Sequence, residues 1–114
     1  MAKARIARDP NNPAYVMIPD ELKDVIPKPY ATEQVPDPNV YVKLFTPDAN
    51  WTWFITEYDS VERRAFGMVV GLETELGYFD LNELEEIRGP LGLPIERDLS
   101  WQPKPLSVVR KETE

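Results

Sequence analysis

The sequence predicts a single domain of the α+β class, built from a four- to five-stranded, mainly antiparallel sheet and two short helices. A chain of 114 residues has the size of one domain and can bury a core without disulfides. Apolar residues alternate with a period of two through the middle of the chain, between short polar turns that favour antiparallel neighbours. Two short segments carry helix start and stop signals instead.

The N-terminal part is rich in proline. Residues 1–15 are predicted to be a flexible arm, because prolines flank two asparagines there. Residues 18–26 predict a short helix, since Pro19 suits a first turn and a proline follows the last residue. Three apolar residues share one face of this helix and should dock on the core: Leu22, Val25 and Ile26. Residues 27–39 are expected to be an extended connector.

Two strands follow, over residues 40–45 and 51–58, joined by a polar turn at residues 46–50. One face of the first strand would carry Val40, Val42 and Leu44. One face of the second would carry Trp51, Trp53 and Ile55, and the other Thr52, Phe54 and Thr56.

A third strand is predicted over residues 65–72, and it has one bulky and one nearly bare face. The bare face consists of Ala65, Gly67, Val69 and Gly71. Such a strip would let either a packed helix or a ligand approach the sheet closely.

After a tight turn at residues 73–75, residues 76–79 predict a short fourth strand. Asp80 and Glu83 then have the spacing of a capping box, which predicts a helix over residues 81–88. Its inward residues would be Leu84 and Ile87.

A last strand is expected over residues 95–101, with Ile95, Arg97 and Leu99 on one side. Two prolines close the fold, and residues 109–114 are predicted to be a frayed, charged tail. The single domain would therefore span residues 16–108.

Composition excludes many chemistries. The chain contains no cysteine and no histidine, so it has no thiolate, no imidazole base and none of the commonest zinc ligands. We predict no cofactor, no bound metal and no catalytic residue.

The net charge of −7 disfavours binding to duplex nucleic acid. The sequence contains no run of about 18 apolar residues, so it predicts no membrane span. The N-terminus lacks a secretory apolar stretch, which predicts a cytoplasmic location.

Two constellations are candidates for binding. Aromatic residues could form a stacking platform for a base, although the two tryptophans of one strand face could equally be core. This set comprises Tyr41, Trp51, Trp53, Tyr58, Tyr78 and Trp101. Arg88, Arg97 and Lys104 could converge on a phosphate or carboxylate. Alternatively, Arg88 complements the end of its helix and Arg97 pairs with an acid such as Glu96 or Glu57. The candidate ligand-binding residues are Trp51, Trp53, Tyr58, Arg88, Arg97, Trp101 and Lys104.

The carboxylates offer oxygen ligands, but nothing in their spacing singles out a catalytic or metal-binding pair. Gly-rich phosphate loops and dinucleotide fingerprints are absent from the sequence.

Two long segments resemble a known family. Residues 40–53 (VYVKLFTPDANWTW) and residues 75–98 (ELGYFDLNELEEIRGPLGLPIERD) are similar to two blocks of the family called domain of unknown function 2958. The resemblance covers nearly all of the chain after residue 17, and the arm before it departs from the family pattern. It implies a setting in bacteria, phages, plasmids or integrating elements, near genes for conjugation or for evading host defence. It implies no catalytic residues.

The leading functional hypothesis is a non-enzymatic binding protein of a phage or mobile element. It would act as an accessory or counter-defence factor that binds a host protein or a small phosphorylated molecule. One alternative is a metal-dependent nucleotide hydrolase that uses carboxylates alone. Another is a structural or regulatory subunit that pairs with another chain through an exposed strand edge or the glycine face, a homodimer being one form of it.

Overall fold

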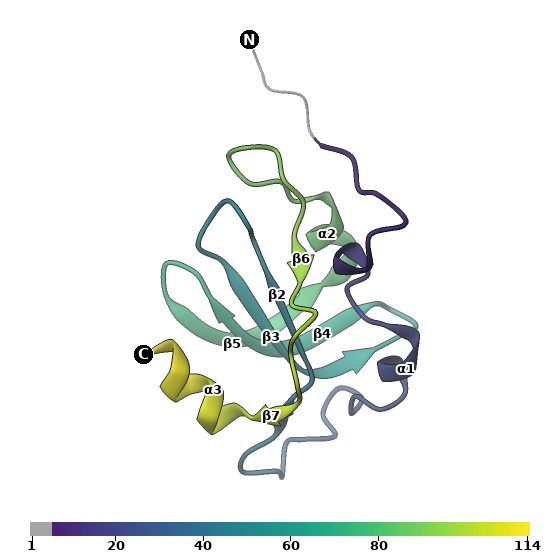
Figure 1. The fold of residues 1–114 in the computed structure, drawn as a ribbon. Helices are drawn as coiled ribbons and strands as arrows, with labels where there is room; N and C mark the ends of the chain where they lie inside the picture. Colours follow the sequence, from purple (N-terminus) through teal and green to yellow (C-terminus); the bar gives the residue numbers. More distant parts are fainter. Residues whose placement is uncertain (1–5) are drawn as a thin grey trace.

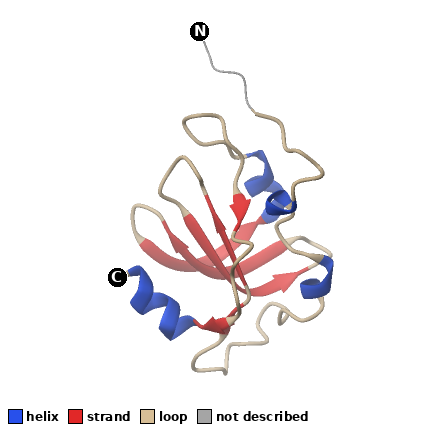
Figure 2. Cartoon of the chain, viewed as in Figure 1, coloured by secondary structure: helices blue, strands red, loops and turns tan. Residues whose placement is uncertain are grey.

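The computed structural model describes residues 6–114 and confirms the α+β class. A five-stranded antiparallel sheet in the order β5-β4-β3-β2-β6 forms its centre (Figure 1). These strands are β2 (Val42–Phe45), β3 (Thr52–Asp59), β4 (Arg64–Val70), β5 (Thr74–Asp80) and β6 (Glu96–Arg97). A two-stranded antiparallel sheet pairs β1 (Asn39–Val40) with β7 (Lys104–Pro105). The helices, blue in Figure 2, are the 3-10 turn η1 (Pro13–Tyr15), α1 (Asp20–Lys23), α2 (Leu81–Glu86) and α3 (Leu106–Thr113).

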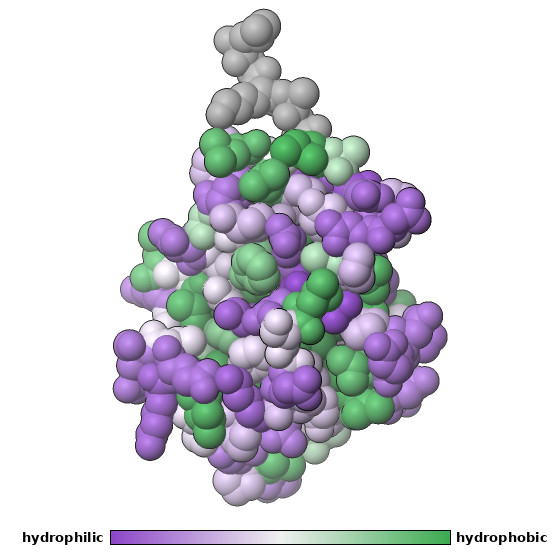
Figure 3. All heavy atoms as spheres, in the orientation of Figure 1, coloured by the Kyte–Doolittle hydropathy of each residue, from purple (hydrophilic) through white to green (hydrophobic). Residues whose placement is uncertain are grey.

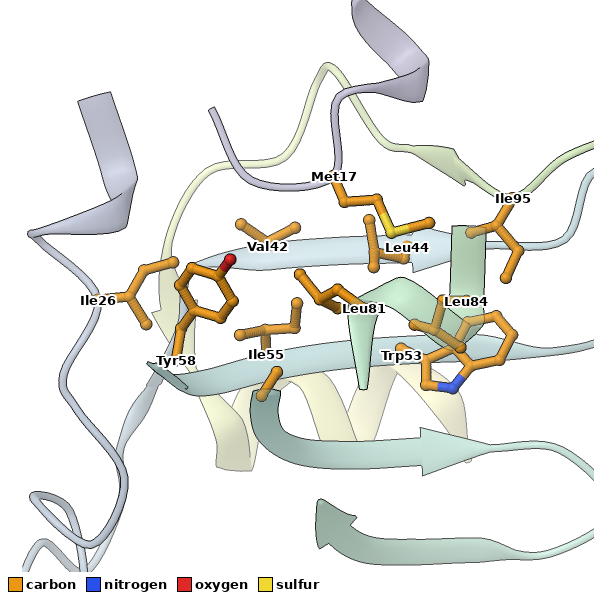
Figure 4. Close-up of a cluster of buried hydrophobic side chains, with 11 residues drawn as sticks. Met17, Ile26, Val42, Leu44, Trp53, Ile55, Tyr58, Leu81, Leu84 and Ile95 are labelled. Atoms are coloured by element: carbon orange, nitrogen blue, oxygen red, sulfur yellow. The ribbon is translucent and has the colours of Figure 1, made fainter. Parts of the chain in front are cut away.

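Apolar side chains cover both faces of the large sheet, which gives three layers. The larger cluster joins the sheet to α2 and to the N-terminal segment (Figure 4). It consists of Met17, Ile26, Val42, Leu44, Trp53, Ile55, Tyr58, Ala65, Leu81, Leu84 and Ile95. The smaller cluster lies between the opposite face and α3 and consists of Val40, Phe54, Met68, Leu106 and Val109. Alternation along β3 explains the division, since Trp53 and Ile55 enter one cluster and Phe54 the other.

A β-bulge interrupts this alternation. The pairing of β3 with β4 shifts register between Ile55 and Glu57. One extra residue reverses the faces that follow, so Tyr58 joins Ile55 in the larger cluster. Glu57 consequently points to the opposite face, where it pairs across the strands with Phe66.

The predicted first strand is broken in two at Tyr41. Tyr41 donates its N–H to the Ile55 carbonyl (2.9 Å) but lies outside both β1 and β2. Because of this break, Val40 packs in the smaller cluster, while Val42 and Leu44 lie in the larger one. The prediction that all three share one face was therefore wrong for Val40.

Groups of the protein itself fill the bare strip of β4. Ala65 packs in the same cluster as Leu81 and Leu84 of α2, as expected for a packed helix. A Cβ on Gly67 would lie 1.8 Å from the Phe54 carbonyl oxygen, so this glycine makes room for the backbone of β3 beside the bulge. A Cβ on Gly71 would meet the Trp51 ring at 2.3 Å.

Four predicted elements are shorter than expected. Helix α1 ends at Lys23, which leaves Val25 57% exposed rather than docked on the core. Helix α2 ends at Glu86, and the extended backbone of Ile87 turns this side chain outward, against our prediction. Strand β4 ends at Val70, so Leu72 is exposed, and β6 ends at Arg97, where a turn begins that leaves Leu99 exposed. Strand β5, in contrast, is longer than predicted.

The ends of the chain also differ from our expectation. The frayed tail predicted over residues 109–114 is instead the greater part of α3, and Val109 is almost fully buried.

Within the predicted arm, residues 1–5 lie outside the described residues, whereas residues 6–15 contact the domain. Arg8 donates to the carbonyls of Glu85 (2.9 Å) and Leu84 (3.3 Å) at the end of α2.

Candidate functional site

A row of three side chains crosses the sheet on the face that carries α3. Glu57 of β3 pairs with Phe66 of β4, and Phe66 pairs with Tyr78 of β5. The ring centroids of Phe66 and Tyr78 are 4.9 Å apart. This row exists only because the bulge turns Glu57 to this face.

The Glu57 carboxylate fastens the loop before β1. It is 3% exposed and accepts hydrogen bonds from the backbone N–H of Tyr30 (2.9 Å) and of Thr32 (3.0 Å), and from the Thr32 hydroxyl. Tyr30 has a left-handed backbone (φ 70°), and its ring lies 5.9 Å from that of Tyr78. The carboxylate thus holds an aromatic ring over the end of the row.

The same loop is fastened at its other end to α3. Asp37 accepts hydrogen bonds from the Ser107 N–H (2.9 Å) and hydroxyl (2.7 Å). The Leu106 N–H donates to the Pro38 carbonyl (2.9 Å). The hydrogen bonds from the Ser107 side chain and backbone lower the pKa of Asp37. Asp37 therefore acts as the N-terminal cap of α3, whose own cap position is a proline without a side-chain hydrogen bond.

A groove of about 710 Å³ lies between this loop, the sheet and α3, and we call it the β5 groove. Figure 3 shows that α3 exposes hydrophilic residues on the face in view, at the lower left. The β5 groove is lined by Tyr30, Thr32, Glu33, Val35, Pro36, Asp37, Pro38, Thr56, Glu57, Phe66, Leu76, Tyr78, Leu106, Ser107 and Arg110.

Tyr78 also makes polar contacts in this groove. A hydrogen bond with the Tyr30 side chain, together with burial and the nearby charge of Glu57, raises the pKa of Tyr78 to about 12. The Arg64 guanidinium lies 5.4 Å from the centre of the Tyr78 ring. The phenol therefore stays protonated in the neutral range, and its ring contacts a cation.

The β5 groove borders a free edge of the sheet. Strand β5 is the last strand in the sheet order, and within residues 6–114 it pairs only with β4. Two of its large side chains are exposed, Leu76 by 49% and Tyr78 by 43%, and both line the groove. The opposite edge is the two-residue strand β6, against which η1 packs.

The structure does not bring the six aromatic candidates together. Trp51 is 42% exposed and stacks on the buried Trp53 at 6.2 Å. Tyr58 is in the larger cluster, and Tyr41 packs against it. Trp101 lies at the other face, where its ring is 5.7 Å from Phe54 and its indole N–H donates to the Val40 carbonyl.

The three basic candidates do not converge either. Arg88 donates to the carbonyls of Ile6 (2.9 Å), Glu85 and Ile87 (2.8 Å each), so it completes the end of α2 as the alternative interpretation expected. It also lines a hollow of about 480 Å³ together with Trp51 and Trp53.

Arg97 and Lys104 are engaged in separate places. Arg97 donates to the carbonyls of Val16 (2.7 Å) and Pro13 (3.2 Å), and burial lowers its pKa. Lys104 forms an ion pair with Glu112 (2.7 Å) and lies 4.4 Å from the centre of the Trp101 ring.

Acidic side chains have local structural roles. Within residues 6–114, no group of three acids is placed to hold a metal ion. Asp80 caps α2 by accepting from the Asn82 N–H (2.7 Å). Asp48 accepts from the N–H groups of Leu91 (2.8 Å) and Leu93 (3.4 Å), and its second oxygen is buried without a hydrogen-bond partner.

Sequence reasoning missed the β5 groove because two of its sides, the loop before β1 and α3, come from segments predicted to be irregular. One signal was available. Strict alternation would have placed Glu57 in the core beside Ile55, and a charged residue there is a sign of a bulge.

The fold and the groove together define a small three-layer α+β protein in which the groove borders the β5 edge of the sheet. Residues 17–113 match the family described as Protein of unknown function (DUF2958), and the chain belongs to this family. The match confirms the predicted resemblance and includes the whole β5 groove. No curated protein and no solved structure shows a significant match. Among the described residues, no helix is both long and apolar enough to cross a bilayer.

Proposed function

We propose that this chain is a binding protein that takes up an extended segment of another protein along β5 and in the β5 groove. The observation that carries the proposal is the seven-residue edge strand, free on one side and bordered by exposed apolar side chains. An unpaired strand edge presents a row of backbone donors and acceptors, which an added strand can satisfy.

The contrast between the two sheet edges supports the proposal. At the β6 edge the strand is only two residues long, η1 packs against it, and Arg97 binds the carbonyls next to η1. At the β5 edge the strand contains neither proline nor lysine, the residues that commonly protect edges. The open edge is therefore the one suited to pairing.

The groove supplies what backbone pairing lacks, namely selectivity for side chains. Alternate residues of an added strand point to the same face. On the α3 side they would meet Leu76 and Tyr78, which occupy alternate positions of β5. A segment with apolar or aromatic residues at every second position fits this arrangement.

The biological setting is a further part of the proposal. An accessory or counter-defence role for a phage or mobile element rests on the family resemblance, and a cytoplasmic location rests on the N-terminal sequence; both stay predictions. A host protein fits the β5 edge better than a small phosphorylated molecule does, because Arg88, Arg97 and Lys104 lie apart.

Selection of short peptides on the full chain tests the proposal. We would select displayed random peptides of about eight residues and map the bound peptides by NMR on the ¹⁵N-labelled protein. We expect enriched peptides with alternating apolar residues, and β5 amides that become protected from hydrogen exchange.

Two leucines offer a matched pair of variants. Leu76→Lys should weaken peptide binding by at least about tenfold, because it places a charge in the apolar contact. Leu99→Lys introduces the same charge at a leucine that is 55% exposed outside the groove and should leave binding unchanged. Equal affinities of the two variants, or protection at another site, would contradict the proposal.

A further inference from the structure

We infer that the row of Glu57, Phe66 and Tyr78 forms a subsite for a basic side chain, arginine or lysine, of the bound segment. The inference rests on the proposed function and adds the chemistry that selects the partner. It follows from the charge of Glu57, the arrangement of the aromatic rings and the composition of the groove.

Glu57 is a buried acid whose charge is not matched by a base. It is 3% exposed, and among residues 6–114 no lysine or arginine forms an ion pair with it. Its Oε2 accepts two hydrogen bonds from Thr32, whereas its Oε1 accepts only one, from Tyr30. A carboxylate oxygen can accept two, so Oε1 retains one position for a donor that enters the groove.

The rings beside this carboxylate are arranged to contact a cation. The Tyr78 ring centroid lies 4.9 Å from that of Phe66 and 5.9 Å from that of Tyr30. The Arg64 guanidinium already lies 5.4 Å from the Tyr78 ring centre. This contact shows that a guanidinium fits against the Tyr78 ring, where cation–π attraction operates.

The charge balance of the groove favours a basic partner. Its lining includes three acids, Glu33, Asp37 and Glu57, against one base, Arg110, and Arg64 beside the Tyr78 ring brings the bases to two. The whole chain carries a net charge of −7, which attracts basic segments over longer distances. A second copy of this chain is a poorer occupant, because its β5 brings Glu75 and Asp80 and no base.

Methylguanidinium is a probe that tests the subsite without any peptide. We would titrate it into the ¹⁵N-labelled full chain at constant ionic strength and follow the resonances of Glu57, Phe66 and Tyr78. The neutral N-methylurea, of nearly the same shape, is the control ligand. We expect saturable shifts with methylguanidinium and none with N-methylurea.

Variants that remove one side-chain charge show where methylguanidinium binds. Glu57→Gln should weaken methylguanidinium binding by about fivefold or more, the loss expected for one charge contact. Glu75→Gln removes the same charge from β5, but its side chain points to the opposite face, so binding should not change. Tyr78→Leu leaves Glu57 in place and should also weaken methylguanidinium binding. This variant tests the subsite even if Glu57→Gln disturbs the loop that Glu57 holds. Equal shifts with both probes, or equal effects of Glu57→Gln and Glu75→Gln, would overturn the inference.

Peptides then separate the two proposals. In a selected peptide that binds along β5, replacing its arginine with citrulline should weaken binding to the wild type but not to Glu57→Gln. Peptides that bind along β5 with no preference for a base would overturn the inference and support the proposed function. Selective binding of methylguanidinium with no peptide bound at β5 would support the basic subsite and overturn the proposed function.

Discussion

The two glycines at the centre of β4 and β5 give the sharpest test of this fold. Gly67 and Gly77 face each other across the two strands. Their surroundings differ, since a Cβ on Gly67 would lie 1.8 Å from the Phe54 oxygen, whereas one on Gly77 would meet nothing within 4 Å. The same substitution to alanine should therefore have opposite effects at the two positions.

The expected magnitudes follow from these distances. Ordinary van der Waals contact begins at 3.4 Å, so Gly67→Ala requires β3 and β4 to move apart by more than an ångström. Overpacking of this kind costs about 1–3 kcal/mol, and we expect the upper end because the contact is backbone to backbone. Gly77→Ala should instead stabilise the strand by about 0.5 kcal/mol, because alanine loses less conformational entropy on folding.

Urea unfolding of the two variants and the wild type would measure the difference. We expect Gly67→Ala to be about 3 kcal/mol less stable than Gly77→Ala, or about 10 °C lower in Tm for a chain of this length. A free energy of unfolding for Gly67→Ala within about 0.5 kcal/mol of the wild type would refute the close approach of Phe54. It would also refute the adjacent bulge, and with it the position of Glu57 in the β5 groove.

Three further predictions concern the chain ends and the groove. Val109→Ala should lower the stability by about 1–2 kcal/mol, whereas Val108→Ala, at a 40% exposed neighbour, should change it by less than about 0.5; equal urea midpoints would mean that α3 is not docked. Arg97→Ala should release residues 13–16 and speed their proteolysis and amide exchange, and Arg97→Lys should not restore them, because lysine lacks the planar fork; unchanged exchange would contradict this anchor. Because the pKa of Tyr78 is raised, its contribution to stability is present below about pH 10 and is lost as the pH rises to about 12. Tyr78→Phe should flatten the fall in the free energy of unfolding over that interval, and an unchanged slope would contradict the hydrogen bond with Tyr30.

Alternation of apolar residues was enough to predict the sheet. It placed Trp53 and Ile55 on one face and Phe54 on the other, as observed. Such patterns work because burial of one face acts on every second residue of a strand. The pattern failed at Tyr41 and at the bulge, where pairing with distant strands decides which way the chain turns.

Helix α3 shows why the rest could not be predicted. Its cap is Asp37, a residue 70 positions away in the sequence, and its own cap position is Pro105. Local signals therefore mark no beginning for the helix, and its charged sequence resembles a solvated tail. The groove shares this limit, because both ends of its loop are held by residues distant in the sequence.

Several charged residues of this protein hold its own backbone. Arg97 binds the carbonyls beside η1, Arg88 completes α2, and Asp37 caps α3. A base used in this way has few remaining positions for a ligand, and the basic candidates Arg88, Arg97 and Lys104 do not form a common site. Among the described residues, backbone groups without a strand partner lie along the outer side of β5, next to the row that leads to Glu57. An edge strand gives affinity without selectivity, and a single carboxylate among aromatic rings gives selectivity without much affinity. Their proximity in one groove is the reason to test them as a single site.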